Sequence, residues 1–161
     1  MADLFDWQHH LKAALEACRR AGEIHREHFR SPGLAVQLKA DASPVTQSDR
    51  LAEEAIREAL SAAAPGLGFL GEELGQEGDE RDRWIIDPLD GTRNFVAGLP
   101  YFGILIGLEL DGEIVLGVVH APVLDEGTWW AARGQGAFAG TGTAFAACRD
   151  RRLRVSQVGD V

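Results

Sequence analysis

The stretch that decides the fold is "RWIIDPLDGTRNF", residues 83–95. Its apolar run, residues 84–86, predicts a buried strand, and two acids three residues apart, Asp87 and Asp90, follow it directly. Carboxylates beside a buried strand are costly unless they pair with or bind something. The stretch therefore predicts a strand that ends in a functional site.

A second pair of acids follows another short apolar run. The segment "GFLGEEL" at 68–74 predicts a strand that runs into Glu72 and Glu73. If the two strands are neighbours, their carboxylates converge at one edge of a sheet, where each raises the pKa of the others unless cations intervene. Hard cations with oxygen ligands, magnesium above all, suit such a cluster, and two bridged ions would make a phosphoryl-transfer site.

The residues "DGTRN" at 90–94 add an anion site to this hypothesis. We expect Asp90 to cap a helix whose first turn contains Gly91 and Thr92, with N–H groups that favour phosphate. The Thr92 hydroxyl would hold an attacking water, and Asp49 would orient Thr92. The alternative for each motif alone is simpler, because such an Asp is often only an N-cap and Glu-Glu is usually a solvated pair. The two motifs together favour the functional interpretation.

The rest of the chain predicts an α+β fold, with helices layered on a mostly antiparallel sheet. The turn signal Asp111-Gly112 lies between two apolar segments and predicts a hairpin. Residues 134–147 are rich in Gly, Ala and Thr and predict irregular structure. The other expected elements are helices at 3–29 and 48–63, the second capped by Ser48, and strands at 36–38, 127–133 and 151–156.

Composition limits the class of protein. With 161 residues and a net charge of −9, the chain suits one domain and disfavours nucleic acid or an anionic membrane as its main partner. It contains neither a signal-peptide pattern nor an apolar run of about 18 residues, so we expect a cytoplasmic protein that does not span a membrane. Cys18 and Cys148 have no metal-ligand spacing and are expected to be free thiols.

We expect the histidines and the adjacent pair of tryptophans to have structural roles. His9, His10, His25 and His28 lie on the first expected helix without an accompanying acidic motif, so we expect them to be at the surface or half-buried. His120 is expected to be a packing or loop residue. Of the neighbours Trp129 and Trp130, one should face the core and the other the surface of a strand.

Four segments together resemble the inositol monophosphatase family of magnesium-dependent, lithium-sensitive phosphatases. "WIIDPLDGTRNFVAGLP" at 84–100 resembles its first signature, and "FLGEELG" at 69–75 its upstream Glu-Glu motif. "LKADASPVTQSD" at 38–49 resembles its mobile metal-site loop, and "GVVHAPVLDEGTWWAARGQGAF" at 117–138 the strand pair after the signature. Within the family, 94–103 and 121–138 look more like bacterial histidinol-phosphate phosphatases than animal inositol phosphatases.

The resemblance implies a metal site with two or three magnesium ions and inhibition by lithium. Glu72, Asp87 and the Leu89 carbonyl would hold the first ion, and Asp87 would bridge to a second ion that Asp90 also binds. Glu73 would be a supporting acid close by. The resemblance also implies a homodimer.

The resemblance further assigns the phosphate chemistry. Gly91 and Thr92 would bind phosphate through backbone N–H groups, with Asp90 contributing to the substrate site. Thr92, Asp49 and Glu72 would be catalytic, and Lys39 would lie on the mobile loop. The implied reaction is hydrolysis of inositol monophosphate or histidinol phosphate by direct attack of a metal-activated water.

One departure from the family pattern concerns the end of the chain. Family members continue into a second α/β half with a Trp-Asp motif, whereas this chain ends at "RRLRVSQVGDV". We therefore expect a single domain, residues 1–161, that corresponds to the N-terminal half of the family fold and lacks the C-terminal α/β half. The alternative function is a catalytically impaired homologue or a metal-binding interaction module.

Overall fold

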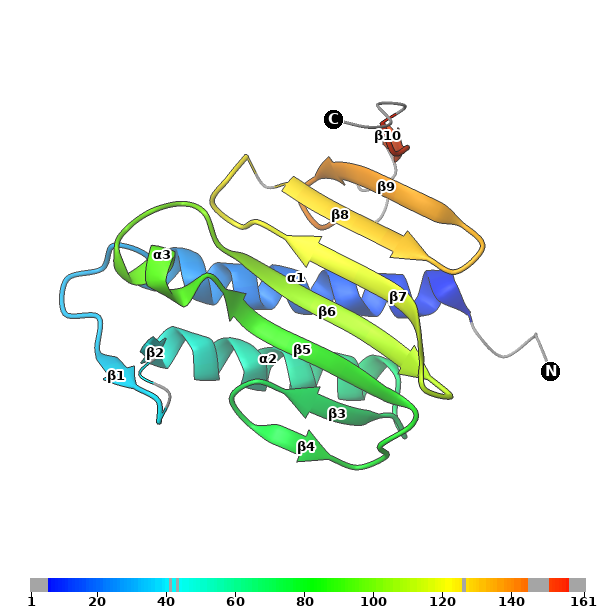
Figure 1. Cartoon of the computed structure of the whole chain (residues 1–161), viewed down its shortest axis with the longest axis horizontal. Helices are drawn as coiled ribbons and strands as arrows, with labels where there is room; N and C mark the ends of the chain where they lie inside the picture. Colours follow the sequence, from blue (N-terminus) through cyan, green and yellow to red (C-terminus); the bar gives the residue numbers. More distant parts are fainter. Residues whose placement is uncertain (1–5, 41, 43, 126, 145–150, 157–161) are drawn as a thin grey trace.

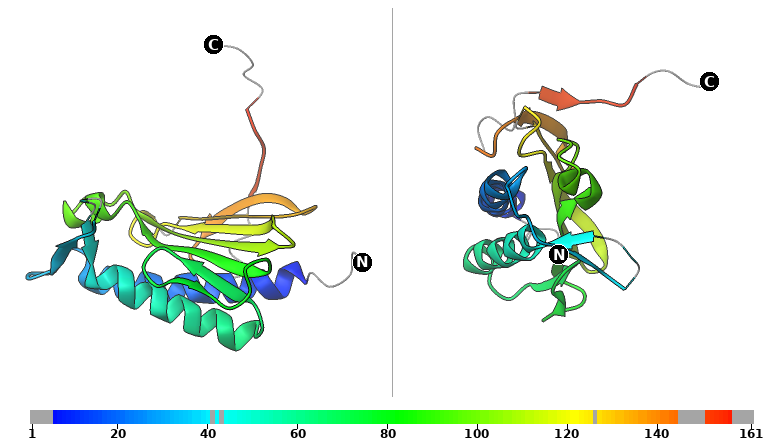
Figure 2. Two further views of the ribbon diagram at one scale, coloured as in Figure 1. Left: turned by 60° about the horizontal axis from the view of Figure 1, so that its bottom comes forward. Right: turned by 90° about the vertical axis from the view of Figure 1, so that its left-hand side faces the viewer.

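Two long helices lie side by side on one face of an eight-stranded sheet (Figures 1 and 2). The computed structural model describes residues 6–40, 42, 44–125, 127–144 and 151–156. The strand order is β10-β9-β8-β7-β6-β5-β3-β4, and every neighbouring pair is antiparallel except β3 and β5, which run parallel. The predicted α+β fold with helices layered on a mostly antiparallel sheet is therefore confirmed.

The elements have the following bounds. The helices are α1 (Trp7–His28), α2 (Gln47–Ala63) and the short α3 (Thr92–Val96). A separate two-stranded sheet pairs β1 (Val36–Leu38) with β2 (Pro44–Thr46). The main sheet contains β3 (Gly68–Gly71), β4 (Gly75–Glu77), β5 (Arg83–Asp90), β6 (Gly103–Leu110), β7 (Glu113–His120), β8 (Gly127–Ala132), β9 (Gly136–Thr141) and β10 (Arg151–Leu153).

The core lies between the sheet and the two helices. Apolar side chains at every second strand position, such as Trp84, Ile106 and Leu108, are buried against α1 and α2. The opposite face carries the intervening residues, among them Val119 and Trp129, which are 40% and 38% exposed. Trp130, the neighbour of Trp129, is buried, so the prediction that the two tryptophans face opposite sides is confirmed.

The helix boundaries correct the sequence prediction. Helix α1 begins at Trp7 rather than at residue 3, because the Asp6 carboxylate accepts hydrogen bonds from the N–H groups of Gln8 and His9 and caps it. Helix α2 is capped by Thr46 rather than Ser48: the Thr46 side chain accepts from the Ser48 N–H, and Asp49 accepts from the Thr46 N–H. This reciprocal pair is a capping box.

The strand predictions were mostly confirmed. The Asp111-Gly112 turn joins β6 to β7, and both residues have the positive φ that a tight hairpin turn of this type requires. The prediction of irregular structure over 134–147 was wrong at 136–141, because β9 pairs with β8 there. Cys18 is buried and is not part of a disulfide, whereas Cys148 lies outside the described residues. Within the described ranges, no helix is long and apolar enough to cross a membrane.

Candidate active site

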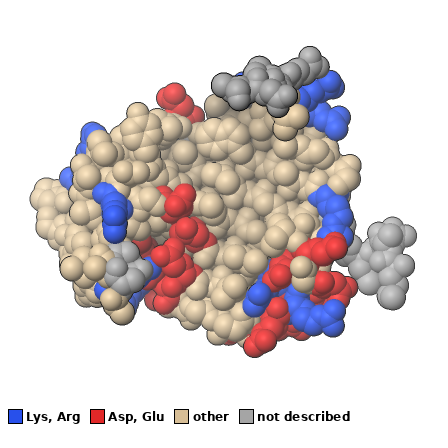
Figure 3. Space-filling model, in the orientation of Figure 1, with Lys and Arg blue, Asp and Glu red and all other residues tan. Residues whose placement is uncertain are grey.

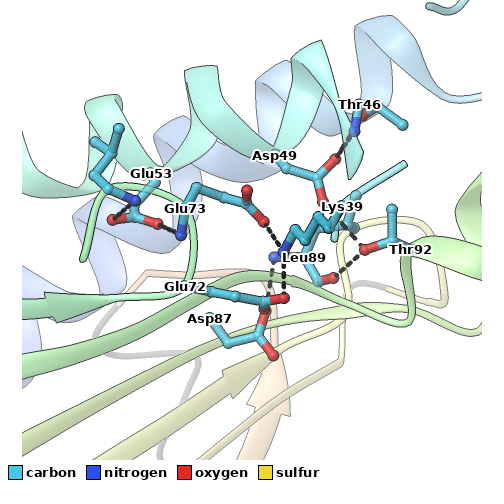
Figure 4. A network of polar contacts seen from close by, with 10 residues as sticks. Lys39, Thr46, Asp49, Glu53, Glu72, Glu73, Asp87, Leu89 and Thr92 are labelled. Atoms are coloured by element: carbon cyan, nitrogen blue, oxygen red, sulfur yellow. Dashed lines mark hydrogen bonds and ion pairs between the residues drawn. The ribbon is translucent and has the colours of Figure 1, made fainter. Parts of the chain in front are cut away.

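The parallel pairing of β3 and β5 brings the two predicted acidic motifs together. Gly71 pairs with Ile86, and the Glu72 N–H donates to the Ile86 carbonyl over 3.1 Å. Because the two strands run in the same direction, the residues that follow this last pair, Glu72 and Asp87, lie next to each other, although β5 continues to Asp90. Figure 4 shows their carboxylates side by side, and Figure 3 shows acidic side chains gathered where β3 and β5 end.

Crowding of negative charge changes the titration of this pair. Burial, the charge of Glu72, a hydrogen bond with Glu72 and the charge of Asp90 together raise the pKa of Asp87 to about 7. A hydrogen bond from the Leu89 N–H to Asp87 Oδ1, 3.1 Å long, partly opposes this rise. In the absence of a cation, Asp87 therefore holds a proton up to near-neutral pH.

Asp90 lies at the end of β5 but does not cap α3, which corrects the sequence prediction. It still pairs with Gly103 of β6, across a register shift that separates it from Asp87. Gly91 occupies the N-cap position instead, with φ of 89°, and no side chain caps the helix there. A Cβ at Gly91 would lie 2.9 Å from the Tyr101 carbonyl oxygen, so both the backbone conformation and the space require glycine.

Thr92 and Asp49 meet as predicted. The Thr92 hydroxyl lies 3.1 Å from Asp49 Oδ1 and 3.0 Å from the Leu89 carbonyl oxygen, so its single proton is shared between two acceptors. The other Asp49 oxygen accepts from the Thr46 N–H and hydroxyl, over 2.8 and 2.6 Å. The capping box of α2 thus fixes Asp49, and the lone pairs of the Thr92 oxygen remain able to accept a hydrogen bond.

Lys39 places a positive charge among the acids. Its Nζ lies 2.7 Å from Glu72 Oε1 and 2.6 Å from Glu73 Oε1, as Figure 4 shows. Burial acts to lower the pKa of Lys39, but the hydrogen bonds to Glu72 and Glu73 outweigh it and raise that pKa above its usual range. Burial raises the pKa of Glu73, against the effect of Lys39. Lys39 thus links the two acids of the Glu-Glu turn.

Sequence reasoning missed the buried pair that supports the Glu-Glu turn. Glu53 of α2 is fully buried and accepts hydrogen bonds from the N–H groups of Glu73 and Leu74 and from the Arg57 guanidinium. Arg57 also donates to the Gly75 carbonyl over 2.6 Å. The signal in the sequence is an acid on the apolar face of the helix with an arginine four residues later.

His25 was also missed, and the expectation that it lies at the surface or is half-buried is wrong. The imidazole is fully buried: Nε2 lies 2.7 Å from the Pro88 carbonyl oxygen and Nδ1 lies 2.8 Å from Ser48 Oγ. Since a carbonyl only accepts, Nε2 carries the proton and Nδ1 accepts from Ser48. Burial lowers the pKa of His25 to about 4, consistent with a neutral ring that positions the segment between Asp87 and Leu89.

The donors at this site suit a magnesium ion. Among the described residues, no group of three His, Cys, Asp or Glu side chains is arranged to hold a metal ion. Magnesium, however, usually keeps several waters and binds through only one or two carboxylates. Glu72, Asp87 and the Leu89 carbonyl supply oxygen donors alone. Burial first, and the charges of Glu72 and Asp90 next, raise the pKa of Asp87, and a divalent cation would stabilise its ionised form.

Comparisons with known proteins show which proteins this chain is similar to. The model of the inositol monophosphatase family matches residues 6–160. The chain is 45% identical over 152 residues to a histidinol-phosphatase of Mycobacterium tuberculosis, covering 94% of this chain and 56% of that protein. It is 44% identical over 149 residues to an inositol-1-monophosphatase of Mesorhizobium japonicum, covering 91% and 52%.

A solved structure gives the same result for the fold. The extragenic suppressor protein SuhB of Bartonella henselae superposes with a TM-score of 0.78 at 41% identity, covering 91% of this chain and 53% of that one. The chain thus spans about half the length of the curated relatives it matches.

Proposed function

The chain belongs to the inositol monophosphatase family, and from that premise we propose that it forms the metal- and phosphate-binding part of a magnesium-dependent phosphomonoesterase. The observation that carries the proposal is the meeting of Glu72 and Asp87 directly after the last parallel pair of β3 and β5, Gly71 and Ile86, close to Thr92. The proposed substrates are histidinol phosphate and inositol monophosphate, because relatives of this chain bear those names.

Each residue has a role in the proposal. Glu72, Asp87 and the Leu89 carbonyl would hold one magnesium ion, and Asp87 and Asp90 a second. A bound magnesium ion would lower the pKa of a water and offset charge on the leaving oxygen. Glu73 would support the site from the adjoining turn, where Glu53 holds its N–H.

The attacking water would be positioned by Thr92. Because the Thr92 hydroxyl donates to Asp49 and the Leu89 carbonyl, its lone pairs are left to accept a hydrogen bond from water. Gly91 and the first turn of α3 present backbone N–H groups without intrahelical partners, to which the phosphate would bind. Direct attack of water on phosphorus would release inorganic phosphate and the alcohol, with no covalent intermediate.

The test is phosphate release from both substrates with magnesium and with a chelator. We expect release that requires magnesium and that Asp87→Asn lowers at least about a hundredfold, because one metal ligand is lost. Glu58→Gln, an exposed acid on α2, is the matched control and should leave the rate unchanged. Thr92→Val should lower kcat at least about a hundredfold with little change in metal affinity, because it removes the hydroxyl that would position the water and none of the proposed metal ligands.

Calorimetry separates the alternative function from the first. Magnesium binding that is abolished by Asp87→Asn, without phosphate release from either substrate, would indicate a metal-binding module with no turnover. The absence of release, together with the absence of magnesium binding both in the original chain and in Lys39→Met, would refute the metal site itself.

A further inference from the structure

The ammonium of Lys39 lies between two carboxylates of the proposed metal site. It contacts Glu72 over 2.7 Å and Glu73 over 2.6 Å, distances typical of strong, charge-assisted hydrogen bonds. Glu72 is also the proposed partner of Asp87 in holding a cation. The ammonium of Lys39 therefore contacts an oxygen of Glu72, which is one of the proposed metal ligands.

The side chain of Lys39 is only partly exposed, whereas the strand that precedes it makes few contacts with the rest of the molecule. The lysine side chain is 25% exposed and that of Glu73 only 5%. Strand β1, which ends one residue before Lys39, is exposed along its whole length and pairs only with β2, outside the main sheet. Leu38 is 72% exposed. Lys39 can therefore leave the acids without disturbing the packed core.

We propose that Lys39 is a built-in competitor for the cation site, which neutralises Glu72 and Glu73 in the metal-free protein and is displaced when a divalent cation binds. This inference rests on the proposed function, because it assumes that Glu72 holds metal. An ammonium and a divalent cation repel each other strongly at contact distance in a partly buried site, so one must leave as the other binds. The measured affinity for magnesium would thus include the free energy of displacing the Lys39 ammonium from Glu72 and Glu73.

The first test is calorimetry of magnesium binding to the metal-free chain. Lys39→Met keeps the apolar stem and removes the charge. We expect it to bind magnesium about tenfold more tightly, because magnesium no longer competes with the two partly exposed ion pairs of Lys39. Lys39→Arg keeps the charge and should bind nearly as the original chain does. The chain has one other lysine, Lys12, which is exposed on α1, and Lys12→Met is the matched control that should change nothing.

The second test follows the lysine itself in the unmutated protein. With lysine labelled by ¹³C at Cε, the spectrum contains one signal from Lys39 and one from Lys12. Titration with magnesium should move the Lys39 signal to the position of a solvated lysine and leave the Lys12 signal in place. The same titration of Asp87→Asn should leave both signals unmoved, because the proposed metal site is broken.

The outcomes distinguish this inference from the proposed function. If magnesium binds and Asp87→Asn abolishes binding, but Lys39→Met binds no more tightly and the Lys39 signal stays in place, the competitor role is overturned while the metal site stands. If the chain binds magnesium only after Lys39→Met, the competitor role is supported. If neither the original chain nor any lysine variant binds magnesium, both proposals are overturned.

Discussion

At Asp87, burial and neighbouring carboxylates raise the pKa to about 7, whereas an isolated aspartate titrates near 3.8. Because the folded-state pKa lies above the unfolded one, the folded protein binds a proton that the unfolded chain has released between these two values. Ionisation of Asp87 therefore lowers the free energy of unfolding as the pH rises through this window, and the full loss is present above pH 7. Without metal, ionised Asp87 destabilises the fold, and a bound cation would offset this effect.

This leads to a prediction for Asp87→Asn in a chelator. At pH 8 the unfolding free energy of the variant should exceed that of the original chain by about 1 to 2 kcal/mol, a range that allows for the partial exposure of the side chain. Near pH 4 we expect no gain. Urea unfolding at the two pH values measures the difference. Asp111→Asn, on the exposed hairpin turn, is the control. An equal gain at both pH values would contradict the role of charge.

A second prediction at this scale concerns Gly71, which lies against the buried pair that supports the Glu-Glu turn. A Cβ at Gly71 would lie 1.8 Å from Glu53 Oε1 and 2.8 Å from Arg57 Nη2. Glu53 cannot shift without losing its backbone partners, so Gly71→Ala should cost about 1 to 3 kcal/mol of unfolding free energy.

Gly117→Ala is the matched control for this substitution, because nothing lies within 4 Å of the added Cβ there and the residue is also in a strand. Its unfolding free energy should stay within about 0.5 kcal/mol of the original value. Urea unfolding that gave equal losses at Gly71 and Gly117 would show that the contact with Glu53 is unimportant.

Residues of the site differ in how far the sequence predicts them. Glu72 and Asp87 each follow an apolar run, so their convergence needed only the assumption that the two strands are neighbours. Glu53 and His25 act through partners that are distant in sequence, and nothing in their local pattern identifies those partners. His25 does continue the three- and four-residue spacing of the buried face of α1, which predicts burial if the series is extended.

At the scale of elements, the capping box of α2 links stability to the site. Thr46→Ala removes the hydroxyl that accepts from the Ser48 N–H and donates to Asp49. We expect a loss of about 1 kcal/mol of unfolding free energy. We also expect slower phosphate release, because Asp49 then holds Thr92 less firmly.

Asp6→Ala is the control for this substitution, because Asp6 caps α1 at the end of the molecule away from the site. It should cost a similar free energy of unfolding in urea and leave the rate of phosphate release unchanged. Equal effects of the two variants on that rate would show that the α2 cap acts on stability alone.

Individual elements show why part of the fold escaped prediction. The hairpin of β6 and β7 carries its turn signal and its apolar pattern within one segment, so local sequence is enough. Strand β9 has no clear alternation of apolar and polar residues, and its pairing with β8 decides its structure. The short α3 was expected at its observed place, but its cap came from the backbone of Gly91 rather than from an acid.

For the whole molecule, the face of the sheet opposite the helices is the most informative surface. Val119 of β7 and Trp129 of β8 are paired neighbours there, and both are substantially exposed. Figure 3 shows that the middle of this face carries little charge. Apolar surface of this kind favours association. The homodimer that the family resemblance implies stays a prediction, and this face is where we expect contact.

We therefore predict that the isolated chain associates as its concentration rises. Replacing both Val119 and Trp129 with threonine keeps β-propensity while removing apolar area, and should shift the association to at least about tenfold higher concentration. Sedimentation velocity measures this. Ile114→Thr, an exposed residue near the hairpin turn, is the control. Unchanged association in the double variant would place the contact elsewhere.

The parallel pairing of β3 and β5 at the site also affects the kinetics of folding and unfolding. Glu72 and Asp87 meet only when β5 has docked beside β3, with β4 and a loop connecting the two strands. We expect contacts of this kind to form late in folding, because the chain between the two strands must first close a loop. A divalent ion shared by the two acids would then recognise the finished protein alone. It would lengthen the lifetime of the native state and leave the speed of refolding unaltered.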